Sequence, residues 1–493
     1  MSPLDYGIFG LYMVAVLGVG WYFHRRNRSA EDYFVGSRSI SPGHVGLSVA
    51  ATDVGGGFSI GLGGLGYTLG LSGNWLLFTG LVGAWLSAVF IIPRLKAVDV
   101  REGMMTYPDF LRFRYDGRVA LAAAVISALG YLGFTSGQIL AGAKLMAGSL
   151  LESAPLGMEV LTFATLIIGV VVVAYTVLGG LKAVIYTDTI QWLLLMAGLL
   201  LLALPFTLRE IGGWGALARA LPPGHMSLTS VGPVTLFNWF ITIAPIWVVG
   251  MTLYQRMYAC RTVREAQRAW YIAGLFEWPV MAFSGVTLGM MSRVLFPGID
   301  GELGVPMLLT EVLPVGMAGL VVAAYFSAIM STADSCVIAS SGNLVGDLLQ
   351  RSPLRIRDPR RLIRVSQAST LALGMAAVII AWRFDQVLDA ILNAYAFLVS
   401  GLFVPTLGAY FWPRATARGA LWGMVSGGTT TLLLLVTGVT TPFGLDPSFW
   451  GILVSGTVFW GLSLLDEAPA RVACAPPPSP PASTRKEAEA PHG

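Results

Sequence analysis

Long apolar runs separated by short polar connections dominate the hydrophobic pattern along the chain. Each run has about the length that a helix needs to cross a bilayer, whereas the strands of a membrane barrel would be shorter and would alternate. The predicted spans are 6–23, 43–70, 74–93, 119–149, 157–178, 187–207, 233–254, 270–295, 314–345, 364–383, 387–411, 418–438 and 447–465. The pattern therefore predicts an all-α integral membrane protein with about 13 transmembrane helices.

The composition agrees with a membrane protein. Of the residues, 55% are hydrophobic and 12% are charged, and the mean hydropathy is +0.70. A soluble domain has about 25% charged residues. The net charge of +4 does not indicate a nucleic-acid partner, because the basic residues lie in short loops. Three cysteines are too few for a disulfide framework or a metal site.

Lys and Arg are concentrated in alternate connections between the predicted spans. Because positive loops stay in the cytoplasm, this asymmetry places the N-terminus outside and the C-terminus inside. The last residues, 466–493, are rich in Ala, Pro and Ser and cannot bury a core. We expect them to form a disordered cytoplasmic tail.

One apolar run contains a group of oxygen-bearing side chains, Ser331, Thr332, Asp334 and Ser335. On a helix, Ser331 and Ser335 lie one turn apart, so oxygens from adjoining faces can converge on one small hard cation. The alternative is that the hydroxyls cap their own helix and join it to its neighbours. Asp334 favours a cation, because a carboxylate at membrane depth is costly without a partner.

Two predicted spans contain helix-breaking sequences. In the first, Asp53 is followed closely by three glycines, 55–57, and unwinding there would free carbonyls near Ala51 and Val54. The alternative is that the glycines allow close helix packing. The second break, at 244–250, lies five spans later. Breaks at corresponding positions of two halves are typical of inverted-repeat transporters with a site at the midplane.

This interpretation divides the chain into five parts. They are a peripheral helix and cytoplasmic loop, 1–42; a first five-helix repeat, 43–207; a second five-helix repeat, 233–411; two C-terminal transmembrane helices, 412–465; and the tail, 466–493.

Four further polar residues lie within predicted spans: Gln138, Lys144, Asp188 and Glu277. Snorkelling would explain Lys144 and pairing with a neighbouring donor would explain Glu277, so neither is given a role. Asp188 is either an interfacial helix cap or a carboxylate within reach of Asp334 and Ser335.

Five motifs occur in order along the chain. They are 32–38 (DYFVGSR), 179–184 (GGLKAV) with Asp188 and Gln191, Gln255-Arg256 with 264–266 (REA), 331–335 (STADS), and 411–416 (FWPRAT) with 418–420 (RGA). Over about residues 30–430 the chain resembles the sodium/solute symporter family, which has the leucine-transporter type of fold.

The resemblance implies secondary active transport by alternating access in a bacterial cytoplasmic membrane, with Na⁺ as the coupling ion and no enzymatic activity. It implies a sodium site formed by the carbonyls of Ala51, Val54 and Ala328 and the hydroxyls of Ser331 and Thr332. Some members hold a second sodium, for which the matching residues are Asp188, Ser331, Asp334 and Ser335. Asp53 resembles an acid of amino-acid-transporting members and is expected to tune sodium affinity.

The solute is expected beside the same broken helices. The candidates are Gly56, Gly57, Phe58, Phe134, Ser136, Gln138, Trp247 and Asn393. Residues 136–145 are similar to a helix of the family's proline carriers, but Gly57 stands where those carriers have an aromatic residue. This combination favours a small zwitterion or an organic acid.

Two alternatives remain open at the level of the sequence. The first is a membrane sensor of solutes, although the tail is far shorter than a folded signalling domain. The second is a proton-coupled symporter with Asp53, Asp188 and Asp334 as proton carriers. The expected partners are a small solute and the lipid bilayer, and a monomer would be sufficient.

Overall fold

The computed structural model describes residues 1–24, 38–53, 55–176, 181–345, 356 and 358–467. These residues form helices and connecting loops, with no β-strand among them. Within this described part, 9 helices are long and apolar enough to cross a membrane, or 10 if one bent pair counts as a span. Shorter apolar stretches occupy Pro3–Val16 and Val160–Val173, each within a longer helix. The chain is thus a multi-pass helical membrane protein.

Helices lie over all the predicted ranges. In the first half they are α1 (Pro3–His24), α3 (Pro42–Asp53), α4 (Gly55–Leu69), α5 (Trp75–Leu86), α6 (Ile92–Glu102), α7 (Tyr107–Arg114), α8 (Gly117–Ser149), α9 (Val160–Thr176), α10 (Leu181–Ala197), α11 (Leu204–Ile211) and α12 (Trp214–Ala220). In the second half they are α13 (Pro233–Ile243), α14 (Ile246–Val249), α15 (Met251–Ala259), α16 (Val263–Leu275), α17 (Ala282–Leu295), α18 (Gly301–Glu311), α19 (Met317–Gly342), α20 (Pro359–Ala381), α21 (Val387–Phe411), α22 (Ala417–Thr437) and α23 (Pro447–Leu465). Six short 3₁₀ or π segments lie between some of the described helices: η2 (Gly70–Asn74), η3 (Ser87–Ile91), η4 (Pro155–Gly157), η5 (Gly198–Ala203), η6 (Phe276–Met281) and η8 (Pro442–Gly444).

A sharp turn separates α4 from α5. Gly70 begins η2 with φ +72°, which an α-helical residue does not adopt. A Cβ there would lie 2.2 Å from the carbonyl oxygen of His225, so only glycine fits. The turn explains how the continuous helical stretch Gly57–Glu102 can hold the end of the predicted span 43–70 and the whole of the span 74–93.

Both predicted helix breaks are present. Helix α3 ends at Asp53 and α4 begins at Gly55, which has φ +50°. Val54, between them, lies outside the described residues. In the second half, Gly250 has an extended conformation (φ −65°, ψ 116°), and the helix axis bends there by 44°.

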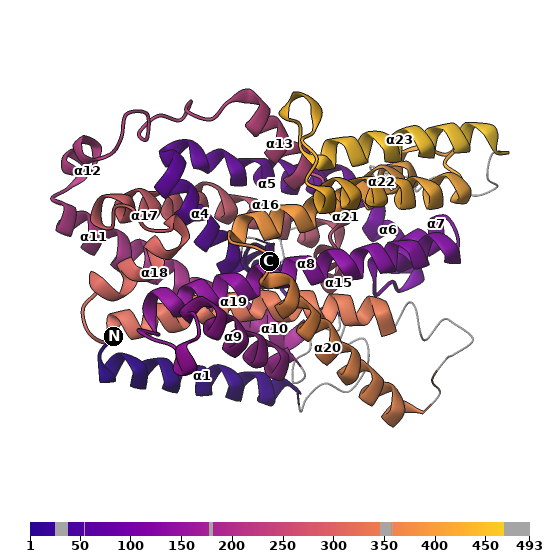
Figure 1. Ribbon diagram of the computed structural model, residues 1–493. Helices are drawn as coiled ribbons and strands as arrows, with labels where there is room; N and C mark the ends of the chain where they lie inside the picture. Colours follow the sequence, from indigo (N-terminus) through magenta and orange to yellow (C-terminus); the bar gives the residue numbers. More distant parts are fainter. Residues whose placement is uncertain (25–37, 54, 177–180, 346–355, 357, 468–493) are drawn as a thin grey trace, which may run out of the picture.

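Helix α19 lies at the centre of the bundle. It contacts α1, α8, α10 and both halves of the broken span, α3 and α4. The most apolar stretch of this helix is entirely buried. In Figure 1, α1 lies along one edge of the molecule and α22 and α23 lie along the opposite edge. The oxygen-rich stretch of α19 is therefore enclosed by protein, next to the end of α3.

Candidate functional site

The end of α3 and the middle of α19 meet through the hydroxyl group of Thr332. Its Oγ1 lies 3.1 Å from the carbonyl oxygen of Ala51 and 3.0 Å from that of Ala328. Ser331 Oγ lies 3.4 Å from the same Ala328 oxygen. Because α3 ends at Asp53, the Ala51 carbonyl lacks a partner within its own helix. The structure thus brings four of the five residues of the expected sodium site together.

Close approach of the two helices depends on Gly55. A Cβ at this position would lie 2.6 Å from Thr332 Oγ1, and its φ of +50° is unfavourable for other residues. The glycine after the break thus allows the start of α4 to lie against the hydroxyl groups of α19.

A buried ion pair lies beside this point. Arg256 Nη2 of α15 is 3.1 Å from Asp188 Oδ2 of α10, and both side chains are 0% exposed. The predicted span 233–254 ends before Arg256 and so places it in a connection, which is wrong because its guanidinium group is buried inside the bundle. Asp188 is likewise not an interfacial cap, because it lies about two turns after the start of α10 and its carboxylate is buried against Arg256.

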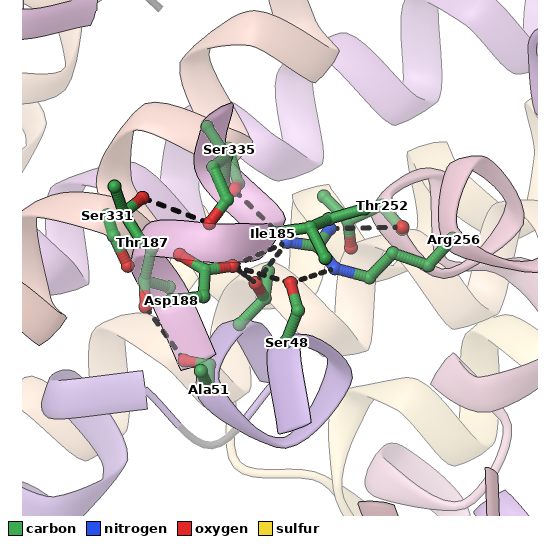
Figure 2. Close-up of polar contacts among 12 residues, drawn as sticks. Ser48, Ala51, Ile185, Thr187, Asp188, Thr252, Arg256, Ser331 and Ser335 are labelled. Atoms are coloured by element: carbon green, nitrogen blue, oxygen red, sulfur yellow. Dashed lines mark hydrogen bonds and ion pairs between the residues drawn. The ribbon is translucent and has the colours of Figure 1, made fainter. Parts of the chain in front are cut away.

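Hydroxyl groups complete the surroundings of this pair (Figure 2). Ser48 Oγ donates to Asp188 Oδ2 over 2.6 Å and accepts from Arg256 Nε over 3.0 Å. Arg256 Nη2 also donates to Thr52 and, over 3.4 Å, to Ser335 Oγ. The guanidinium therefore uses oxygens from three helices, α3, α10 and α19, including two residues of the expected second sodium site.

Asp53 lies at the end of α3 next to a group of aromatic rings. Tyr395 of α21 donates its hydroxyl proton to Asp53 Oδ1 over 3.1 Å. The same tyrosine ring stacks on Phe134 at a centroid distance of 5.1 Å and lies 6.0 Å from Phe58. Tyr395 was not predicted, because a tyrosine in an apolar helix resembles an ordinary core residue.

Gln138 connects α8 to the first turn of α4. Its Oε1 accepts a hydrogen bond from the backbone N–H of Gly57 over 3.1 Å. Its Nε2 is buried and has no hydrogen-bond partner within the described ranges. A Cβ on Gly57 would lie 2.4 Å from this nitrogen, so the amide lies directly against the glycine. Gly56 belongs to the same turn.

Three other solute candidates have different surroundings. Ser136 Oγ bonds to the carbonyl oxygen of Gly133 in its own helix, and the Trp247 ring lies 6.3 Å from that of Trp270. Asn393 is only half-buried. In the part of the chain that the structure describes, no hydrogen bond or ring contact joins these three to Asp53 or Gln138.

The remaining polar residues of the spans differ from expectation. Lys144 does not snorkel: its Nζ lies 2.6 Å from Asp300 and 2.8 Å from Glu302, and its side chain is 1% exposed. Glu302 also accepts hydrogen bonds from the backbone N–H groups of Val387 and Leu388. Burial raises the pKa of Glu302 from its ordinary value, while the ammonium of Lys144 acts in the opposite direction. Glu277 pairs with no hydrogen-bond donor among the described residues.

Comparison with known proteins identifies the family. The model of the Sodium:solute symporter family matches residues 33–427. The chain belongs to this family. It is therefore a membrane transporter rather than an enzyme, and sodium is its coupling ion.

Relatives of this symporter match over almost the whole chain. The High-affinity proline transporter PutP of Bacillus subtilis (strain 168) is 28% identical, with 92% of this chain and 97% of the relative covered. A Sodium/proline symporter of Staphylococcus aureus is 25% identical, with 94% and 93% covered.

Solved structures confirm the fold. An outward-open, substrate-bound Na⁺-coupled sialic acid symporter has a TM-score of 0.76 at 20% identity, covering 95% of this chain and 99% of the other. Mhp1, a nucleobase-cation-symport-1 family transporter in a closed conformation, has a TM-score of 0.58 at 14% identity, covering 89% and 94%.

Proposed function

We propose that this symporter imports a small organic solute, either a zwitterion such as an amino acid or an organic acid, together with sodium held between α3 and α19. The observation that carries the proposal is the position of the Thr332 hydroxyl, within hydrogen-bond distance of carbonyls from both helices. Such a cluster of neutral oxygens is suited to an alkali cation.

The sodium ligands are Ala51, Val54, Ala328, Ser331 and Thr332. A cation at this point attracts both carbonyls at once, and the Thr332 hydroxyl then offers its lone pairs instead of its proton. The cation thus holds the end of α3 against α19. If only one conformation brings these oxygens together, sodium raises its population, and solute and sodium strengthen each other's binding.

The guanidinium group of Arg256 already lies among the residues expected to bind a second sodium, which are Asp188, Ser331, Asp334 and Ser335. Arg256 donates to Asp188 and to Ser335, and a further cation there would be repelled by the guanidinium. A second sodium would therefore require Arg256 to move away, and we assign one sodium to the arrangement described here.

The solute lies on the other side of the break. The free amide N–H of Gln138 and the first turn of α4 suit a carboxylate, since the N-terminus of a helix is partly positive. Asp53 suits an ammonium group and tunes the nearby cation site. The rings of Phe58, Phe134 and Tyr395 suit the apolar body of the solute. The similarity to proline transporters supports the same class of solute.

The finer topology also belongs to the proposal. Thirteen crossings with an external N-terminus and a cytoplasmic C-terminus agree with helices over all the predicted ranges and with the distribution of Lys and Arg. Two breaks, after Asp53 and at Gly250, support two inverted repeats.

Uptake into proteoliposomes tests the proposal. Proline is assayed first, followed by other amino acids, carboxylates and sialic acid, with an inward sodium gradient or an equal gradient of choline. We expect accumulation of one small organic solute in sodium only. Equal uptake in choline would contradict the mechanism. Uptake that follows a pH gradient without sodium would favour proton coupling, and solute binding without any uptake would favour a sensor.

A further inference from the structure

Glu277 is a carboxylic acid buried within the bundle that the transport mechanism above does not use. It lies in η6, between α16 and α17, and is 1% exposed. Neither Oε1 nor Oε2 has a hydrogen-bond partner within the described ranges of the chain. A buried group with four free acceptor positions is unusual and calls for a ligand.

Local sequence places this carboxyl group against α5. Trp278 interrupts the helix with φ −141° and ψ 125°, and Pro279 has no backbone N–H to donate. On the facing helix, a Cβ at Gly80 would lie 1.9 Å from Glu277 Oε1. The glycine thus leaves the space that the carboxyl group fills.

The surroundings of Glu277 are mainly apolar and aromatic. The Phe276 ring lies 4.9 Å from that of Trp192, and the Trp278 ring lies 5.1 Å from that of Phe78. An ionised carboxylate is strongly disfavoured in such a place unless it binds a cation. Sodium needs several oxygen ligands, but α5 offers Glu277 the bare Cα of Gly80. A proton needs only the carboxyl group itself.

Few charged groups on the neighbouring elements face Glu277. Helix α3, which η6 contacts, carries Asp53 at its end and His44, which is turned toward Thr189 and Tyr186. Helix α5 carries no titratable residue, and in α10, whose Trp192 packs on Phe276, Asp188 is paired with Arg256.

The helices on either side of η6 carry further titratable residues, which all point elsewhere. In α16, Arg264 and Arg268 are exposed, Glu265 caps the first turn, and Tyr271 packs on Trp85. Arg293, near the end of α17, lies over the ring of Tyr67. Of the titratable groups named here, Asp53 is the one that belongs to the site described above.

We infer that Glu277 is a proton-binding site whose occupancy opposes sodium binding at the end of α3. Segment η6 contacts α3, and Asp53 lies two residues after the proposed sodium ligand Ala51. A sodium ion there favours the ionised form of Glu277, because opposite charges attract in a medium of low dielectric constant. By reciprocity, protonation of Glu277 weakens sodium binding. The inference rests on the proposed sodium site.

Equilibrium binding of radiolabelled sodium to the purified full chain tests this coupling without knowledge of the solute. Choline chloride keeps the ionic strength constant while the pH is lowered from about 9 to about 5, a range that includes the pKa values of about 6 to 9 documented for buried glutamates. We expect the half-saturating sodium concentration of the parent protein to rise at least about fivefold, the lower end of typical coupling between sites. In Glu277→Gln, which resembles the protonated acid, we expect less than a twofold change.

Glu210→Gln is the matched control, because Glu210 is exposed on α11. It should keep the pH dependence of the parent. The same dependence in Glu277→Gln, or no dependence in the parent protein, would overturn the inference and leave the sodium site intact. Absence of sodium binding at every pH would overturn both proposals.

A second measurement needs no variant and covers the case in which Glu277→Gln does not fold. Addition of sodium chloride to the parent protein in weak buffer should release protons, whereas choline chloride should not. Absence of proton release across the same pH range would overturn the inference.

Discussion

Arg256 and Asp188 carry opposite charges in the interior of the bundle, where neither is exposed to solvent. Removal of one partner leaves an uncompensated buried charge, which typically costs about 3–5 kcal/mol. We therefore expect Asp188→Asn and Arg256→Gln each to lower the stability of the folded protein by about this amount. Thermal unfolding in detergent measures the effect. The double variant should recover part of the loss, and full stability of either single variant would contradict a structural role of the pair.

Tyr395 offers a narrower test of the solute site. The substitution Tyr395→Phe keeps the ring that stacks on Phe134 and removes only the hydroxyl that bonds to Asp53. Without this hydrogen bond the Asp53 carboxylate is no longer held in place for the solute, so we expect the half-saturating solute concentration to rise about tenfold, which corresponds to about 1.4 kcal/mol.

Tyr410→Phe is the control for this variant. Tyr410 lies on the same helix and is also buried, but its hydroxyl bonds to that of Tyr254. It should leave the half-saturating solute concentration nearly unchanged. Equal effects of the two variants would remove Tyr395 from the solute site.

The sequence reveals some of these residues and hides others. Ser331, Thr332 and Asp334 are visible because oxygen-bearing side chains are rare in an apolar run. Arg256 stands at the end of a predicted span, where a basic residue looks like part of a loop. Only the tertiary structure shows that α15 continues to Ala259 and carries the guanidinium to Asp188.

Helices and their breaks are well predicted where neighbouring residues in the sequence determine them. Glycines 55–57 after Asp53 disfavour a continuous helix, and the structure breaks there. Helix ends are less certain, because charged residues can be buried in pairs. The predicted span 74–93 stops before Lys96, yet Lys96 pairs with Asp99 inside the protein and the helix continues to Glu102.

The break after α3 leads to a prediction at the scale of the element. Gly55→Ala introduces a Cβ 2.6 Å from Thr332 Oγ1 and strains a residue with φ +50°. Both effects push α4 away from α19. Because a displacement of about 1 Å at a functional site can lower activity by up to about a hundredfold, sodium-stimulated uptake should fall at least about tenfold. In Gly43→Ala the new Cβ has no neighbour within 4 Å, and uptake should be normal. Normal uptake in Gly55→Ala would show that close approach at Gly55 is not required.

Across the whole molecule, ion pairs join helices that are far apart in the sequence. Lys144 of α8 binds Glu302 of α18, which in turn caps the start of α21. Lys144→Met leaves this acid buried without a compensating cation, so we expect a loss of about 3–5 kcal/mol in the free energy of unfolding.

Arg418→Met provides the comparison, because it removes an exposed ion pair with Asp466. Such pairs contribute at most about 1 kcal/mol. Similar unfolding temperatures for Lys144→Met and Arg418→Met would contradict a stabilising role of the buried network.

Hydropathy predicts where each helix lies, because an apolar helix must be long enough to cross the bilayer. It does not decide which helices surround the site or how the two breaks face each other, since these depend on contacts between distant segments. Helices α3, α10, α15 and α19 meet around Asp188. The sequence predicts that Asp188 lies near α19, but it does not predict that Arg256 of α15 pairs with it.

The most direct test of the account measures the sodium concentration that gives half-maximal uptake in Ser331→Ala and Thr332→Ala. Thr437→Ala is the control, because Thr437 is exposed on α22 and bonds to its own helix. The account predicts at least about a tenfold rise for Thr332→Ala, a smaller rise for Ser331→Ala and no change for the control, as expected when a charged ligand loses a buried oxygen. Unchanged half-saturation in both site variants would contradict a sodium ion held between α3 and α19.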